Sequence, residues 1–235
     1  MENLKLTVVY DNHLHNERLK SGWGFSCLAE YSDKKILFDT GDNPEKLSFN
    51  LDALGINPQD FQAVVLSHNH WDHTGGLQAL APAKNYKLYF GKSYPARFQG
   101  RMKSLGINFF LVDDLRRIEQ DVYAGPQMAA LGIKEIPLTL KTPKGLVIIT
   151  GCAHPGILKI IKRLKEELQQ DVYLVLGGFH LGAVFALEGV VAGFRKTGVV
   201  KVAPCHCTGE RAIALFERYF KQDFIRVGSG VKIEI

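Results

Sequence analysis

Four side chains that commonly bind metal ions lie close together, directly after an apolar run of the chain. The run is Phe61–Leu66, and the side chains are His68, His70, Asp72 and His73. If the run is a β-strand, His68 and His70 point to one side, because side chains alternate along a strand. Asp72 and His73 then lie on the turn beyond it, free to face a second ion. This stretch predicts a metal-binding loop at a strand end that serves two cations.

Three later apolar runs, each expected to be a β-strand, also lead into a turn that carries a histidine. They are Gly145–Thr150 before His154, Asp171–Leu176 before His180, and Val199–Ala203 before His206. With the three histidines of the first loop, six of the eight histidines in the chain follow predicted strands. Strand ends in a layered α/β protein converge on one edge, where ligands bind. We therefore expect these side chains to form a single site.

Apolar runs and helical patterns alternate along all 235 residues without a linker or a break in composition, which predicts one domain, residues 1–235. The other expected strands are Leu4–Tyr10, Gly24–Tyr31, Lys35–Phe38, Tyr86–Phe90, Ile107–Val112, Leu138–Lys141, Phe224–Val227 and Val231–Ile235. The expected helices are Asn43–Leu54, Gly76–Leu80, Ile157–Gln169, Val184–Lys196 and Arg211–Phe220. Between Lys92 and Leu131 no clear periodicity is present, and the elements there are the hardest to predict.

Two further sets of polar residues have competing interpretations. Asp39 ends the strand Lys35–Phe38, where it can accept the second ring N–H of a ligand histidine and fix that ring's orientation. The alternative is an ordinary turn or helix-capping residue. His13 and His15 have ligand spacing but no partner motif, so we interpret them as part of an exposed loop, with a metal-ligand role as the alternative. A polar loop of this kind could also serve as a lid over the site.

The net charge and the positions of the cysteines limit which partners and which cellular compartment we expect for the chain. The net charge is +5, and its basic residues are spread along the chain instead of gathering on one face, which disfavours nucleic acid and is compatible with a small anionic substrate. The basic run Lys159–Lys165 is expected to be the solvated face of a helix. No apolar stretch is long enough for a membrane span, and residues 1–10 resemble a strand more than a signal peptide. Three of the four cysteines lie beside histidines, which favours reduced thiols and a cytoplasmic protein. No oligomeric state is predicted.

The motif His-x-His-x-Asp-His resembles that of the metallo-β-lactamase superfamily. Four pieces narrow the resemblance to the branch named after 7,8-dihydropterin-6-methyl-4-(β-D-ribofuranosyl)aminobenzene-5′-phosphate synthase, a branch of metal-dependent hydrolases. The pieces are Ser67–Leu77, Thr150–Ile157, Gly177–Leu181 and Pro204–Glu210. The resemblance implies an α/β fold, a four-layer αβ/βα sandwich with the metal site at strand ends along one edge. Relatives usually carry an acidic stretch before the Thr-Gly-Cys strand, of which this chain keeps Glu135.

The resemblance also implies a ligand set. The first metal would take His68 and His70 with a third histidine, and the second would take Asp72, His73 and His206. Between His73 and His154 the chain has no histidine, so His154 is the candidate for the third ligand.

Alternatives remain for several of these residues. Cys152 occupies the place of a bridging aspartate, and is either a bridging thiolate or an inert buried cysteine. His154 could instead hydrogen-bond locally. His180 is either a catalytic residue that contacts the substrate or a core histidine. Cys205 and Cys207 flank His206 and, by strand alternation, should point away from it as structural residues.

These features predict a hydrolase in which a metal-bridged hydroxide attacks a phosphoester or another small ester. Two divalent ions are expected, with zinc preferred and iron or manganese as alternatives. Asp72 would orient the hydroxide or protonate a leaving group, and His180 would donate to the developing oxyanion. Transfer of a dihydropterin-methyl group to an arylamine, a mononuclear iron thiol dioxygenase, and a metal-stabilised binding scaffold are the alternatives.

Overall fold

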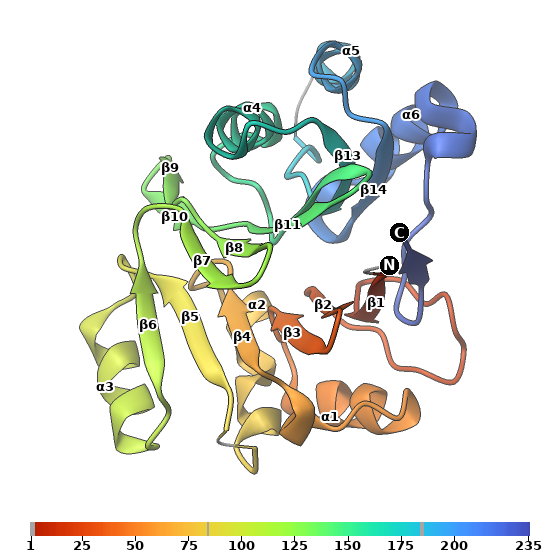
Figure 1. Ribbon diagram of the computed structural model, residues 1–235. Coiled ribbons are helices and arrows are strands. Elements are labelled where there is room, and N and C mark those ends of the chain that lie inside the picture. The colour runs from red at the N-terminus through yellow and green to blue at the C-terminus, as the bar shows by residue number, and fades with distance from the viewer. Residues whose placement is uncertain (1–2, 84, 184–185) are drawn as a thin grey trace.

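Two β-sheets face each other, and helices cover the outer face of each sheet (Figure 1). The structure is a computed structural model, which describes residues 3–83, 85–183 and 186–235. Within these residues the first sheet has seven strands in the order β15-β1-β2-β3-β4-β5-β6. The second has six strands in the order β14-β13-β12-β11-β8-β7, and β9 pairs with β10 in a separate hairpin. This is the expected four-layer αβ/βα sandwich.

The elements of each half follow one another along the chain. The strands of the first sheet are β1 (Leu4–Tyr10), β2 (Ser26–Tyr31), β3 (Lys34–Phe38), β4 (Ala63–Leu66), β5 (Lys87–Gly91), β6 (Phe109–Val112) and the C-terminal β15 (Lys232–Glu234). Its helices are α1 (Pro44–Ala53), α2 (Trp71–Thr74) and α3 (Ala96–Ser104), with 3₁₀ turns η1 (Pro58–Asp60) and η2 (Gly75–Leu80). The strands of the second half are β7 (Arg116–Glu119), β8 (Val122–Ala124), β9 (Met128–Ala130), β10 (Ile133–Glu135), β11 (Leu138–Thr142), β12 (Gly145–Thr150), β13 (Val172–Gly178) and β14 (Lys201–Cys205). Its helices are α4 (Ile157–Leu168), α5 (Leu187–Lys196) and α6 (Glu210–Phe220), with 3₁₀ turns η3 (His206–Thr208) and η4 (Lys221–Asp223).

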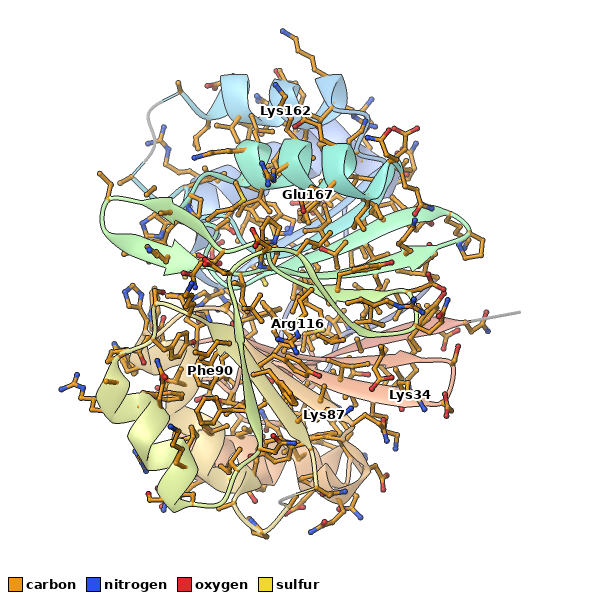
Figure 2. The ribbon with its side chains drawn as sticks, turned by 60° about the vertical axis from the view of Figure 1, so that its left-hand side comes forward. Lys34, Lys87, Phe90, Arg116, Lys162 and Glu167 are labelled. Atoms are coloured by element: carbon orange, nitrogen blue, oxygen red, sulfur yellow. The ribbon has the colours of Figure 1, made fainter. Side chains whose placement is uncertain are left out.

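The apolar core forms three layers between these elements. The central layer lies between the two sheets and includes Phe38, Val65 and Ile149. A second layer lies under α4, α5 and α6, and a third lies under α1, η2 and α3. In the third layer, Phe90 of β5 points towards α3, where its ring centroid lies 5.2 Å from that of Phe98 (Figure 2).

The outer helix α4 shows why its sequence is half apolar and half charged. Its apolar stripe, which includes Ile161 and Leu164, is buried on the second sheet. On the opposite side Lys162 faces solvent and pairs with Glu166 one turn later (Figure 2). This part of the basic run is the solvated face that its pattern predicts.

Most predicted elements are present within a few residues of their expected bounds, but some predictions are wrong. Residues 224–227 form no strand; only Phe224 makes an isolated bridge, to Val202. The predicted helix Gly76–Leu80 is the 3₁₀ turn η2. Helix α3 and strands β7 to β10 were not predicted. Of the predicted helix Val184–Lys196 the structure describes α5, while residues 184–185 lie outside the described part of the chain.

The parallel strands place the predicted site. Strands β3, β4 and β5 run parallel in the first sheet, and β12, β13 and β14 run parallel in the second. Their carboxyl ends bring Asp39, the loop after β4, and the turns after β12, β13 and β14 to one edge of the sandwich. Among the described residues, no helix is both long and apolar enough to cross a bilayer.

Candidate metal centre

The loop after β4 holds its side chains through a bend and a short helix. The strand ends at Leu66, so His68 and His70 lie in the bend that follows it. They do not continue the strand, as the prediction from alternating side chains required. The two rings nevertheless meet, with His68 Nε2 3.0 Å from His70 Nδ1. The single turn of α2 then presents Asp72 and His73, which are both buried.

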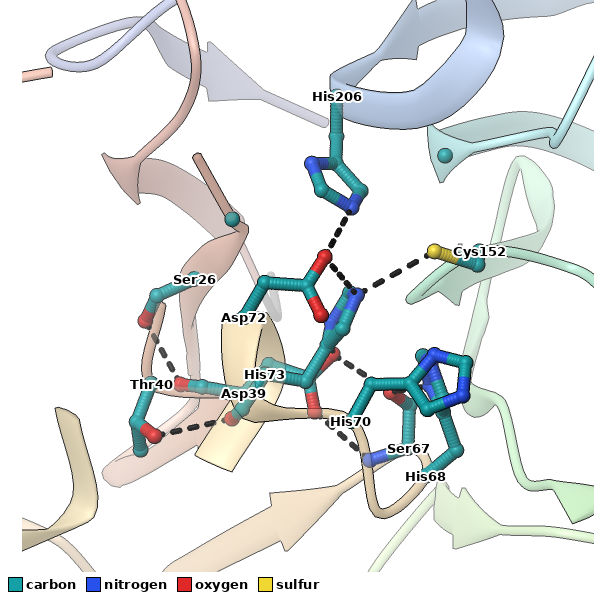
Figure 3. Close-up of polar contacts among 12 residues, drawn as sticks. Ser26, Asp39, Thr40, Ser67, His68, His70, Asp72, His73, Cys152 and His206 are labelled. Carbon is teal, nitrogen blue, oxygen red and sulfur yellow. Dashed lines mark hydrogen bonds and ion pairs between the residues drawn. The ribbon is translucent and has the colours of Figure 1, made fainter. Parts of the chain in front are cut away.

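The predicted ligands gather into two neighbouring groups of donor atoms. One group is His68, His70 and His154, and the other is Asp72, His73 and His206. Within each group, all candidate donor atoms lie within 4.8 Å of one another. His206 Nε2 lies 3.3 Å from Asp72 Oδ2, and His73 Nε2 lies 3.6 Å from the same oxygen (Figure 3). His154, the candidate for the third histidine of the first group, thus lies beside His68 and His70.

Cys152 lies between the two groups. Its Sγ is 3.3 Å from His73 Nε2, and it also forms a close set with His68 and His73 (Figure 3). Its sulfur is therefore close to donor atoms of both groups.

Asp39 is fully buried and fixes two of the candidate ligands at once. Its carboxylate accepts hydrogen bonds from the Ser67 backbone N–H, the Ser67 hydroxyl and His73 Nδ1, each at 2.7 Å (Figure 3). Ser67 Oγ in turn lies 2.9 Å from His68 Nδ1. Both rings therefore turn Nε2 towards the donor groups.

Burial raises the pKa of Asp39 to about 8 in spite of the opposing effects of His68 and Ser67. A side chain at Gly151 would meet Ser67 Oγ, so this close approach requires glycine.

Glu135 is a buried carboxylate whose part in the site was not predicted. It accepts hydrogen bonds from the backbone N–H groups of Cys152, Ala153 and His154, at 2.8, 2.8 and 3.1 Å. It also lies 3.0 Å from His154 Nδ1. Burial opposes ionisation of Glu135, but the hydrogen bond from His154 and the neighbouring His68 ring hold the pKa of Glu135 well below its ordinary value. The carboxylate thus fixes both the turn after β12 and the ring that this turn carries.

His206 has an equivalent support from the N-terminal strand. Asn12 Oδ1 lies 3.1 Å from His206 Nδ1, and Asp11 Oδ2 accepts the His206 backbone N–H at 3.1 Å. Neither residue was predicted to belong to the site. The sequence pattern that could have indicated their role is that Asp11 and Asn12 directly follow β1, just as Asp39 directly follows β3.

His180 and the cysteines around His206 complete the edge of the site. His180 is exposed, and its ring centroid lies 4.5 Å from that of His154. A hydrogen bond with Cys207 raises the pKa of His180 above its ordinary value.

Cys207 was expected to point away from His206, and this is wrong, since its Sγ joins Cys152 and His206 in one donor set. Strand β14 ends at Cys205 and His206 has φ +50°, so the strand alternation stops there.

The remaining histidines behave as the exposed-loop interpretation predicts. His13 and His15 are exposed, and His13 Nε2 lies 3.1 Å from Glu210. Within the described part of the chain neither joins a group of possible metal donors. Cys205 is buried and is also outside these groups among the described residues.

The donor atoms fit divalent cations. Burial and the neighbouring His73 lower the pKa of His68 to about 3, and burial and His206 lower that of His73 to about 4. Both rings are therefore neutral at pH 7, the form that binds metal. Buried His206 Nε2 has no hydrogen-bond partner among the described residues, although Asp72 is near it. A bound cation would explain why this buried nitrogen has no hydrogen-bond partner, although it faces the Asp72 carboxylate and the His73 ring.

A hollow of about 440 Å³ opens beside His154 and His180. Its lining is mostly apolar, with Ile157, Phe179 and Leu181 among the residues. Lys159 lies at its margin and is exposed.

Comparison with known proteins agrees with this geometry. Residues 24–155 match the family model of the metallo-beta-lactamase superfamily. The chain is 30% identical to the 7,8-dihydropterin-6-methyl-4-(beta-D-ribofuranosyl)-aminobenzene-5′-phosphate synthase of Methanocaldococcus jannaschii, over 98% of this chain and 96% of that one.

Solved structures share the fold along the whole chain. A metal-dependent hydrolase of the beta-lactamase superfamily superposes with a TM-score of 0.84 and 28% identity over 99% of both chains. A diphosphatase from the PhnP family shares the fold with a TM-score of 0.65 at 15% identity, over 100% of this chain and 98% of that one. The family match over more than half of the chain and the relative similar along nearly all of it lead to one conclusion: this protein is an enzyme that belongs to the metallo-beta-lactamase superfamily.

Proposed function

We propose that the protein is a metal-dependent hydrolase of a small anionic ester, with a phosphoester as the preferred substrate. The observation that carries this proposal is the pair of adjacent donor groups, one of three histidines and one of Asp72, His73 and His206. We further propose that Cys152 lies between the two cations and that zinc is the resident metal, because imidazole and thiolate donors suit zinc. Divalent cations in these positions supply the charge that makes water nucleophilic near neutral pH and polarises a substrate oxygen.

Two residues of the chain itself serve the proton chemistry in this proposal. Burial opposes ionisation of Asp72, but the neighbouring rings of His206 and His73 hold the pKa of Asp72 well below its ordinary value. Asp72 is therefore an acceptor that orients the attacking water. His180 is exposed beside His154, where its ring can donate a hydrogen bond to the developing oxyanion.

The hollow beside His154 supports a substrate with an apolar part and an anionic group. Ile157, Phe179 and Leu181 offer the apolar surface. Lys159 has no ion-pair partner among the described residues, so its ammonium group is free to bind an anion. We expect Lys159→Gln to raise the KM of an anionic ester several-fold, with kcat and the KM of a neutral ester unchanged. Lys103→Gln, on the exposed face of α3, is the matched control.

Elemental analysis with an activity panel tests the proposed function. Purified protein should hold two metal ions per chain, and His154→Ala should hold fewer. The zinc-loaded protein should hydrolyse phosphoesters in preference to lactones and thioesters. One ion per chain, unchanged in His154→Ala, contradicts the ligand assignment, and inactivity on the whole panel contradicts hydrolysis.

A transferase is the second candidate, and one comparison favours it. The relative that is 30% identical along nearly the whole chain is a synthase with a pterin and an aminobenzene in its name. In a transfer reaction the cations would neutralise a diphosphate leaving group while an arylamine attacks. Incubation with a pterin-methyl diphosphate, with and without an arylamine, separates a coupled product from simple release of diphosphate.

A further inference from the structure

Two cysteines that are far apart in sequence approach each other beside the metal centre. Cys152 follows β12, and Cys207 lies in the turn after β14. Their sulfur atoms and a ring nitrogen of His206 all lie within 4.8 Å of one another. Cys207 Sγ also lies 3.7 Å from the carbonyl oxygen of Cys152.

A glycine in the strand between them makes this approach possible. Strands β12 and β14 flank β13, so their backbones are about 9.6 Å apart, twice the spacing of neighbouring strands. Gly178 ends β13, and a Cβ at this position would lie 2.6 Å from Cys207 Sγ. The missing side chain leaves the space over the middle strand that Cys207 Sγ occupies.

The two thiols differ in their access to solvent. Cys207 is half-buried, whereas Cys152 is 3% exposed. Cys27 and Cys205 are also buried, and among the described residues neither belongs to a group that includes another cysteine. A small oxidant therefore reaches Cys207 first, with Cys152 as the nearby thiol that can respond.

We propose that Cys152 and Cys207 are a reversible redox pair that a peroxide converts to a disulfide. The Cys207 thiolate attacks one oxygen of hydrogen peroxide, becomes a sulfenic acid and releases hydroxide. The Cys152 sulfur then attacks the Cys207 sulfur as a thiolate, the S–O bond breaks, and the hydroxide that leaves takes up a proton to become water. The sum is two thiols and one peroxide giving one disulfide and two waters.

The disulfide would act on the metal centre through Cys152. In the reduced protein Cys152 Sγ lies 3.3 Å from His73 Nε2, among the donors of both groups. A disulfide bond is about 2.05 Å long, so its formation draws this sulfur towards Cys207 and removes a thiolate from the donors. We expect the oxidised protein to lose zinc to a chelator at least ten-fold faster than the reduced protein.

Thiol counting on zinc-loaded protein tests this inference without any measurement of activity. After treatment with hydrogen peroxide and removal of excess oxidant, thiols titrated in denaturant should fall from four to two. Peptide mass spectrometry should place the new bond between Cys152 and Cys207, and dithiothreitol should restore four thiols. Release of zinc is followed in parallel with a colorimetric chelator.

Two serine variants make the outcome specific. Cys207→Ser should keep its three thiols under the same treatment, while Cys205→Ser, two residues away, should still lose two. Four thiols retained by the parent protein overturn the inference, as does a bond that involves Cys27 or Cys205. Unchanged zinc release after the disulfide has formed overturns the link to the metal centre. None of these results depends on the substrate, so failure here is distinct from failure of the proposed function.

Discussion

At the scale of single residues, the candidate ligand rings other than His70 are each held by a second polar group. Asp39, Glu135 and Asn12 hold His73, His154 and His206, respectively, through the ring nitrogen that faces away from the donor groups. Such a contact fixes the tautomer and orientation of a ligand histidine. The strength of metal binding should therefore depend on residues that never touch the metal.

Glu135→Gln tests this dependence. Glutamine keeps one acceptor oxygen for the backbone N–H groups of the turn after β12, but it removes the charge and the second oxygen, which faces His154 Nδ1. We expect the affinity for one of two zinc ions to fall about 10–100-fold, with the other little changed. Isothermal titration calorimetry of metal-free protein measures both. Glu17→Gln, in an exposed loop, is the control, and equal affinities in the two variants would contradict the positioning role of Glu135.

Gly151 offers a steric test of the same network. A Cβ here would press on Ser67 Oγ and lie 3.0 Å from Asp39 Oδ2, which disturbs the link from Asp39 to His68. We expect Gly151→Ala to lower the free energy of unfolding by about 1–3 kcal/mol and to weaken zinc binding. Gly182→Ala, with no described atom within 4 Å of the added Cβ, is the matched control for chemical denaturation. A Gly151→Ala protein as stable as this control would rule out the crowding.

At the scale of elements, local patterns account for the strands that carry the site. Runs such as Gly145–Thr150 are continuously apolar because they are buried on both faces, and the histidines that follow them mark one edge. Helix α3 gave no such signal, since only Met102 in it is buried and Gly100 interrupts it. The short strands β7 to β10 form two local hairpins, β7 with β8 and β9 with β10, but each has only three or four residues, too few for an alternating pattern to stand out. The contact of Glu135 with the turn after β12 was missed for a different reason, because it joins residues 17 to 19 positions apart and no local pattern records it.

Helix α5 provides a prediction at this scale, because it contains two glycines in different surroundings. Gly189 has no described atom within 4 Å of an added Cβ, whereas a Cβ on Gly193 would meet the side chain of Leu158 in α4. Gly189→Ala should raise the free energy of unfolding by about 0.5–1 kcal/mol, since glycine weakens a helix interior. Gly193→Ala should give no net gain, because a forced rotamer of Leu158 costs about 0.5–1.5 kcal/mol. Urea denaturation measures both, and equal gains would show that α4 and α5 do not pack as closely as described.

At the scale of the whole molecule, the candidate metal centre lies between the two halves of the sandwich. Its donors come from the loop after β4 in the first sheet and from the turns after β12 and β14 in the second. The two sheets share an apolar core, but buried imidazoles and carboxylates replace that core at the edge where the donors meet. Cations bound there would join groups that otherwise leave His206 Nε2 without a hydrogen-bond partner among the described residues.

Metal removal should therefore lower the stability of the whole molecule as well as its activity. A ligand that binds only the folded state at 100 times its Kd stabilises that state by about 2.7 kcal/mol. For a chain of this length about 1 kcal/mol corresponds to roughly 2–4 °C in Tm, so chelation should lower Tm by about 5–10 °C. Differential scanning calorimetry at increasing free zinc should show Tm rising with the logarithm of zinc concentration. His206→Ala should flatten this dependence and His15→Ala, in the exposed loop, should not. A Tm independent of zinc in the parent protein would show that the cations do not hold the two sheets together.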